Sequence, residues 1–136
     1  MIFLDTSAVY AMADKADPNH ASALEKFNQA LSARESICLH SYILVESAAL
    51  LQARLGLQVA LQFLKEVTVF QIEWVDQDLH EKALQELKRI GRRGISFVDC
   101  LSFLVMRQRG IKRALAFDPD FIDQGFGLYQ KEIRHG

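Results

Sequence analysis

The segment Ile2-Phe3-Leu4-Asp5-Thr6-Ser7 places three apolar residues directly before an acid and two hydroxyl side chains. The apolar run predicts a short buried strand, and Thr6 and Ser7 are expected to cap a helix that follows it. Further strands are predicted over residues 36–39, 69–75, 113–117 and 126–129, and helices over residues 18–33, 41–55, 57–67, 76–90 and 96–109, with Ser41, Asp76 and Ser96 as caps. Strands separated by helices predict an α/β fold, in which a parallel sheet of four to five short strands has helices on both faces.

The size and composition of the chain indicate one globular domain over residues 1–136. The chain has 136 residues, of which 50% are hydrophobic and 24% are charged, and this excludes intrinsic disorder. Cys38 and Cys100 lie far apart in the sequence, which argues against a zinc site or a redox pair and favours a reducing cytoplasm. No apolar run approaches the ~20 residues of a membrane span, so no membrane association is expected.

Basic residues gather in one part of the chain. Residues 88–113 hold eight Lys and Arg side chains and one acid, a charge of +7, while the net charge of the whole chain is -1. This asymmetry permits a basic face for a polyanion. Arg107 and Arg109 also fit the solvated end of a helix, whereas Arg92 and Arg93, each beside a glycine, fit a loop. Taken alone, the window favours solvated surface over a binding face.

Four acids stand beside or within apolar segments. Asp5 and Asp118 each end a predicted strand, where open α/β sheets bind ligands. Glu46 and Asp99 each interrupt an apolar helix, where an unpaired buried carboxylate costs several kcal/mol. Local explanations exist for three of them: Asp5 as a helix cap, Asp99 in a capping box and Asp118 as the start of a turn. For Glu46, a salt bridge to a distant arginine is the best explanation that does not involve a shared site.

A divalent cation would explain all four acids together. Two carboxylates ~4 Å apart repel by about 4 kcal/mol at an effective dielectric constant of ~20, and a hard ion such as Mg²⁺ or Mn²⁺ reverses the sign of that interaction. The chemistry best served by such a site is phosphodiester hydrolysis, because a bound ion activates water and stabilises charge on the phosphate. The basic window would then hold a nucleic-acid backbone.

Four short motifs resemble those of the PIN domain family, and within it the ribonuclease toxins of VapBC-type toxin–antitoxin pairs. They are Leu4-Asp5-Thr6-Ser7, Glu46 in its apolar helix, Ser96-Phe97-Val98-Asp99 and Ala116-Phe117-Asp118-Pro119-Asp120-Phe121. The resemblance covers essentially the whole chain, although Ser41 stands where the family often has Thr. It implies a three-layer α/β/α fold and an endoribonuclease that depends on Mg²⁺ or Mn²⁺.

The resemblance also assigns roles to residues and implies partners. Asp5, Glu46, Asp99 and Asp118 become the catalytic acids and metal ligands, and Thr6, Ser7 and Ser96 position substrate or water. Asp120 is a further candidate acid, for which a surface turn is the favoured interpretation. The implied partners are an RNA substrate, a small antitoxin protein and a second copy of the chain, and the apolar helices over residues 42–67 are a candidate interface.

Other hypotheses stay open at this stage. The site could hydrolyse DNA or a small phosphorylated molecule, or the chain could be a non-catalytic RNA- or protein-binding module whose acids form structural ion pairs. His20 and His40 are interpreted as structural or surface residues, and His135 as part of a frayed tail. Trp74 and the nine phenylalanines are expected in the core rather than in base-stacking platforms.

Overall fold

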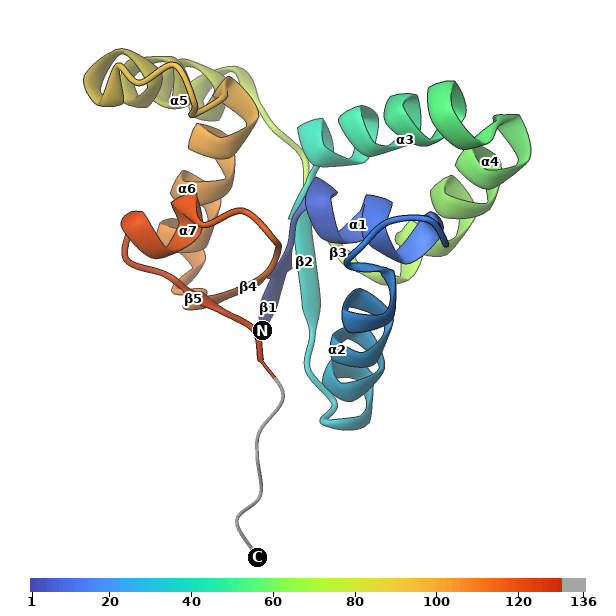
Figure 1. Ribbon diagram of the computed structural model, residues 1–136. Helices are drawn as coiled ribbons and strands as arrows, with labels where there is room; N and C mark the ends of the chain where they lie inside the picture. The colour runs from blue at the N-terminus through green and yellow to red at the C-terminus, as the bar shows by residue number, and fades with distance from the viewer. Residues whose placement is uncertain (131–136) are drawn as a thin grey trace, which may run out of the picture.

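Five parallel strands form one sheet at the centre of the molecule. The computed structural model describes residues 1–130, and His135 lies outside them. The strand order is β3-β2-β1-β4-β5, and each neighbouring pair is parallel (Figure 1). The strands are β1 (Ile2–Leu4), β2 (Ile37–His40), β3 (Gln71–Glu73), β4 (Arg113–Leu115) and β5 (Gly127–Leu128). The predicted parallel sheet of short strands is therefore confirmed.

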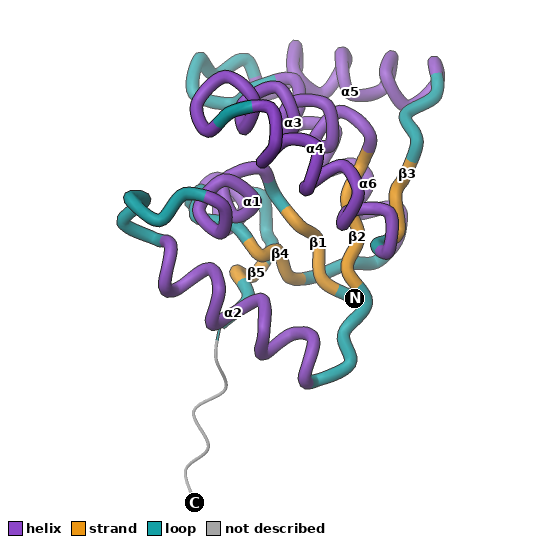
Figure 2. The backbone as a smooth tube through the Cα atoms, turned by 90° about the vertical axis from the view of Figure 1, so that its right-hand side faces the viewer, coloured by secondary structure: helices purple, strands orange, loops and turns teal. Residues whose placement is uncertain are grey.

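Helices cover both faces of this sheet. They are α1 (Thr6–Ala13), α2 (His20–Ser32), α3 (Ser41–Leu55), α4 (Leu57–Glu66), α5 (Gln77–Ile90), α6 (Phe97–Arg109) and α7 (Asp120–Asp123), with a 3₁₀ turn, η1 (Val67–Val69), after α4. Helices α1 to α4 lie on one side of the sheet and α6 and α7 on the other, with α5 packed beside α6 (Figures 1 and 2). The predicted three-layer α/β/α arrangement is confirmed.

The strand order reverses between β1 and β4. From β1 the chain moves outward through β2 to β3 at one edge, then returns through α5 and α6 to β4 on the other side of β1. Ligands of open parallel sheets bind at such a reversal, outside the carboxyl ends of the strands. Asp5 follows β1 directly, and its backbone N–H donates to the carbonyl of Leu115 at the end of β4 (3.1 Å). The fold therefore brings the ends of the Asp5 and Asp118 segments together.

The core is built from the strands and from the buried faces of the helices on both sides of the sheet, with α6 as the largest contributor. Phe3, Phe103 and Phe121 are fully buried, and the other phenylalanines pack against the same core. Trp74 follows the edge strand β3 and is 68% exposed, so its predicted place in the core is wrong. An edge strand has a neighbouring strand on only one side, so a side chain just beyond its end is left open to solvent.

Two helix caps differ from the prediction. Asp5, which the sequence also offered as a helix cap, caps α1 in place of Thr6 or Ser7, because its carboxylate accepts the N–H of Ser7. His40, rather than Ser41, caps α3 through Nδ1, which accepts the N–H of Ile43 (3.2 Å). The Ser41 hydroxyl accepts instead from the N–H of Val75 (2.9 Å). The predicted caps Asp76 and Ser96 are confirmed.

Several predicted boundaries also shift. Helix α2 begins two residues after Pro18, and β3 is shorter than predicted because residues 67–69 form η1. β4 ends at Leu115, and the short helix α7 was not predicted. Both cysteines are buried and free. In the part of the chain that the structure describes, no helix is long and apolar enough to cross a membrane.

Candidate active site

Asp5 is the most buried acid at the carboxyl ends of the strands. Its side chain is held by Ser7, whose backbone N–H and hydroxyl both donate to Oδ2 (3.1 and 2.6 Å). Asp5 is only 6% exposed. Burial raises the pKa of Asp5 to about 6; the hydrogen bonds from Ser7 lower it, and the charges of Asp99 and Asp118 raise it further. Asp5 also lies close to the segment of Asp118, because its own N–H donates to the carbonyl of Leu115 and the hydroxyl of Ser7 accepts the N–H of Phe117.

Asp99 lies in the first turn of α6 and is oriented by a reciprocal cap. Its Oδ2 accepts the N–H of Ser96 (3.1 Å), and the Ser96 hydroxyl accepts the N–H of Asp99 (3.0 Å). The pKa of Asp99 is raised, first by burial and further by the charge of Asp118, while the hydrogen bonds with Ser96 oppose that shift. The capping box predicted as an alternative is therefore present, and it holds the carboxylate near a second acid.

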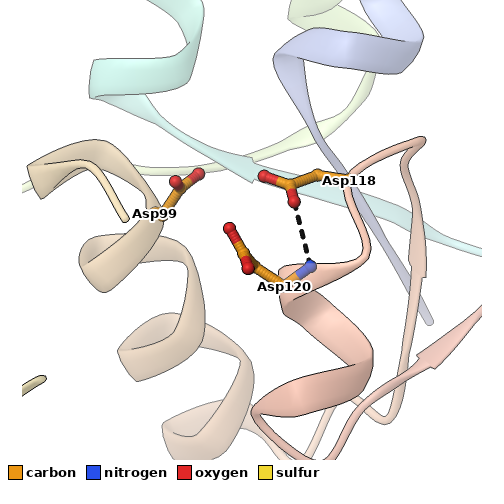
Figure 3. A group of neighbouring side chains, drawn as sticks. All are labelled: Asp99, Asp118 and Asp120. Carbon is orange, nitrogen blue, oxygen red and sulfur yellow. Dashed lines mark hydrogen bonds between the residues drawn. The ribbon is translucent and has the colours of Figure 1, made fainter. Parts of the chain in front are cut away.

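Asp118 and Asp120 complete a compact group of oxygens with Asp99. The ligand oxygens of these three residues all lie within 4.8 Å of one another. Figure 3 shows that the carboxylate of Asp99 on α6 points toward those of Asp118 and Asp120, which flank the start of α7. Asp118 Oδ1 also accepts the backbone N–H of Asp120 (2.9 Å), which closes the predicted turn. The pKa of Asp120 is raised, first by burial and then by the charge of Asp118.

Glu46 is not brought into this group. Its neighbour Ser47 donates to the hydroxyl of Thr6 (3.2 Å), so α3 packs against the start of α1, next to Asp5. The Glu46 side chain is exposed, and it makes no hydrogen bond or ion pair with any residue from 1 to 130. The expectation that it is buried is wrong, because neighbouring apolar residues of α3 are exposed as well, including Val45 at 62%. Its role as a metal ligand stays a prediction.

The three predicted hydroxyl residues are all engaged within the protein. Thr6 accepts from Ser47, and Ser96 accepts from the N–H of Asp99. The Ser7 hydroxyl donates to Asp5 and accepts the N–H of Phe117 (3.0 Å), one residue before Asp118. Ser7 therefore ties the two strand-end acids to each other. Contact of these hydroxyls with substrate or water stays a prediction.

Two residues near the acids, Asp120 and Arg92, lie closer to the site than the sequence indicated. Asp120 was assigned mainly to a surface turn, yet it belongs to the group of three carboxylates. The signal for Asp120 was its position two residues after Asp118, because an Asx turn brings residues at this spacing close together. Arg92 lies with its Nη2 3.9 Å from Asp120 Oδ1, and only its place between two glycines marked it as a loop residue.

The donor set fits a hard divalent cation. Among the described residues, the one group with metal-ligand spacing consists of carboxylates alone, with no histidine or cysteine. Mg²⁺ and Mn²⁺ prefer such oxygen ligands. In each of Asp5, Asp99 and Asp118, one carboxylate oxygen accepts a local backbone N–H, which orients the side chain. The other oxygen is left for a ligand. The raised pKa values of Asp5, Asp99 and Asp120 show the burial and repulsion that a bound cation would relieve.

Known proteins match this chain along nearly its whole length. The 23S rRNA-specific endonuclease VapC20 of Mycobacterium tuberculosis, from two strains, is 38% identical over 128 residues, which cover 93% of this chain and 95% of the relative. A crystal structure of M. tuberculosis VapC20, described as a Sarcin-Ricin loop cleaving toxin, matches with a TM-score of 0.81 and 36% identity over 93% of this chain and 96% of that one. PAE2754 from Pyrobaculum aerophilum matches with a TM-score of 0.61 and 21% identity, over 93% and 86% of the two chains, and shows the fold alone.

The family is shown by the sequence as a whole. The model of the PIN domain matches residues 2–127, which include the acids of all four motifs. The chain belongs to the PIN domain family.

Proposed function

We propose that this PIN-domain protein is a metal-dependent endoribonuclease and the toxin of a toxin–antitoxin pair. The observation that carries the proposal is the group of carboxylates formed by Asp99 at the start of α6 with Asp118 and Asp120 after β4. Asp5, after β1, lies beside this group, because Asp5 and Ser7 are hydrogen-bonded to Leu115 and Phe117 of the segment that leads to Asp118. Acids that have only local structural roles have no reason to lie close together. A site for a divalent cation, in contrast, needs several carboxylates in one place.

Asp5, Asp99 and Asp118 would hold Mg²⁺ or Mn²⁺, with Asp120 and Glu46 as further ligands. When bound, the ion lowers the pKa of a coordinated water and stabilises negative charge on the phosphate. The residues of the chain orient this chemistry: Ser7 and Ser96 fix the carboxylates of Asp5 and Asp99 before the ion arrives. In the hydrolysis, the oxygen of water bonds to phosphorus while a phosphorus–oxygen bond of the RNA backbone breaks and the leaving oxygen takes up a proton.

Ribosomal RNA is the substrate class that we propose. The supporting observation is the 38% identity, along nearly the whole chain, to a 23S rRNA-specific endonuclease. The cytoplasm, where ribosomes lie, is the corresponding compartment.

A small antitoxin protein and a second copy of the chain are the proposed protein partners. An apolar groove of about 830 Å³ lies between α1, α2 and α4, lined by residues that include Val9, Phe27 and Phe63. Leu57 and Leu61 on α4 are about half exposed, at 54% and 49%. Exposed apolar surface of this kind supports a protein partner. Co-expression with the product of the neighbouring reading frame, followed by size-exclusion chromatography with light scattering, tests both associations.

Digestion of purified 23S rRNA by the purified protein tests the proposed function. Discrete cleavage in Mg²⁺ or Mn²⁺ is expected, and excess EDTA should abolish it. Asp118→Asn should remove the activity, whereas Asp76→Asn, a change of the same kind at the cap of α5, should retain it. Cleavage at the full rate in excess EDTA would refute the metal-dependent mechanism. Binding of RNA without cleavage under every condition would support the non-catalytic module.

A further inference from the structure

The basic residues of the window 88–113 fall into two groups within the described part of the chain: some pair with other groups of the protein, and some do not. Four of its arginines are held by other groups of the protein. Arg89 pairs with Glu86 (2.8 Å), Arg113 pairs with Glu35 (2.8 Å) and lies over the Tyr129 ring, Arg107 contacts Gln124 and the Phe126 ring, and Arg109 pairs with Glu73. These arginines have found local partners, so the solvated or structural interpretation of the window holds for them.

Arg92 and Arg93 behave differently. Both lie in the exposed loop between α5 and α6, and Arg93 makes no hydrogen bond or ion pair with any of the described residues. The Arg92 side chain is 53% exposed, and among residues 1–130 its only ion-pair partner within 4.0 Å is Asp120, at 3.9 Å. That distance is too long for a hydrogen bond, so the guanidinium of Arg92 keeps its N–H donors for another acceptor.

The loop lies at the border of the acidic group. It leads directly into Ser96 and α6, whose first turn carries Asp99, and Arg92 reaches across to Asp120 at the start of α7. An RNA chain that enters this space meets several carboxylates, which repel its phosphates. A guanidinium at the border supplies the opposite charge, and its planar fork of donors matches two oxygens of one phosphate.

We propose that Arg92, with Arg93 beside it, binds the phosphodiester backbone of RNA where the strand enters the acidic site. The proposal rests on the proposed function, because it takes RNA as the substrate. It adds the residues that hold the backbone, and it assigns this role to two of the eight basic residues of the window.

The expected effect follows from counterion release. Each phosphate contact with a single strand contributes a slope of about 0.7 to the dependence of log K on log salt concentration. Removal of one contact should therefore lower the slope by about 0.7 and weaken binding about 5-fold at ~0.1 M salt. Arg92→Ala should show this loss, and the double variant with Arg93→Ala should show a larger one. Arg92→Lys should recover part of the affinity, because it keeps the charge and loses the fork.

Lys112→Ala is the matched control. Lys112 belongs to the same basic window, is exposed and makes no ion pair among residues 1–130, but it lies at the start of β4, at the opposite end of the sheet from the acids. The Kd of a fluorescein-labelled single-stranded RNA is measured by anisotropy in EDTA over a series of salt concentrations, with the RNA checked for integrity on a gel. The value of kcat/KM in Mg²⁺ is measured separately.

The outcomes separate this proposal from the proposed function. Weaker binding by the arginine variants alone, with a lower salt slope, supports the proposal, even if the wild-type protein fails to cleave. Arginine variants that bind like the Lys112 control overturn the proposal, while metal-dependent cleavage by the wild type would leave the proposed function intact. A wild-type protein that neither binds nor cleaves RNA overturns both. If Arg92→Ala tightens Mn²⁺ binding and leaves the RNA Kd unchanged, Arg92 only neutralises the acids, and the proposal is wrong.

Discussion

Replacement of Asp5 by asparagine should stabilise the metal-free protein in a pH-dependent manner. Asparagine caps helices about as well as aspartate, and its side-chain oxygen can accept both hydrogen bonds that Ser7 donates to Asp5. It carries no charge, so neither burial nor the charges of Asp99 and Asp118 oppose it. The substitution therefore removes the cost of an ionised, buried carboxylate while it keeps the helix cap.

The size of the effect follows from the pKa of Asp5. That pKa is about 6 in the folded protein against 3.8 as the ordinary value, and each pH unit is equivalent to about 1.4 kcal/mol. Because the pKa is raised on folding, the folded state binds more protons than the unfolded state between these two values, and wild-type stability falls as the pH rises through them. The total loss is about 3 kcal/mol above pH ~6. An unpaired amide N–H₂ in the variant offsets about 1 kcal/mol or more at every pH.

Urea denaturation in excess EDTA at a series of pH values from 4 to 8 measures this effect. The difference in free energy of unfolding between Asp5→Asn and the wild type should grow by about 2.4 kcal/mol between pH 4 and pH 8. Asp76→Asn is the control: it changes a cap of the same chemistry on α5, outside the acidic group. If the Asp5→Asn difference stays constant with pH, or resembles that of the Asp76 variant throughout, the pKa of Asp5 is not raised on folding and the reasoning from its burial is wrong.

Four further predictions test other parts of the site. Asp99→Asn should abolish RNA cleavage and leave the metal-free protein at least as stable in a denaturation assay, because a neighbouring carboxylate oxygen within 4.8 Å repels it by about 1–3 kcal/mol, depending on the dielectric constant; a large loss of stability would favour a purely capping role. Ser7→Ala should destabilise the protein by about 1–3 kcal/mol, because it removes hydrogen bonds to both Asp5 and Phe117, whereas Ser32→Ala on the exposed side of α2 should have little effect. Glu46→Gln should abolish cleavage and change the free energy of unfolding by less than about 0.5 kcal/mol, since the side chain is exposed; a variant with full activity would remove Glu46 from the site. Mg²⁺ or Mn²⁺ at about 100 times its Kd should stabilise the wild type by about 2.7 kcal/mol in a thermal melt, and Asp118→Asn should show no such shift.

The sheet and two of the helix caps were predictable because their signals are local. A short apolar run that ends at polar residues, such as Ile2–Leu4, favours a buried strand, and Asp76 and Ser96 are typical cap residues. The cap of α3 was not predictable in the same way. His40 accepts the N–H of Ile43 through a neutral imidazole, and burial favours this neutral form because it lowers the pKa of His40 to about 4.

The acids show a different limit of the sequence. Their local and shared explanations were treated as alternatives, yet Asp5, Asp99 and Asp118 each combine a local role as a cap or turn with a place near the other acids. The prediction that Glu46 is buried was wrong, because the apolar composition of α3 does not show which face of the helix the rest of the protein covers. The place of Asp120 in the group of carboxylates depends on how the turn before α7 folds. Its spacing of two residues from Asp118 suggests such a turn but does not determine where the side chain points.

Diffraction from crystals grown or soaked with Mn²⁺ and recorded at a wavelength of anomalous manganese scattering tests the central claim most directly. A peak about 2.0–2.2 Å from carboxylate oxygens of Asp99 and Asp118, close to Asp5, is the expected result. Crystals of the Asp118→Asn protein should lack it. A wild-type structure with the three carboxylates turned apart, or with manganese bound only elsewhere on the surface, would contradict the account.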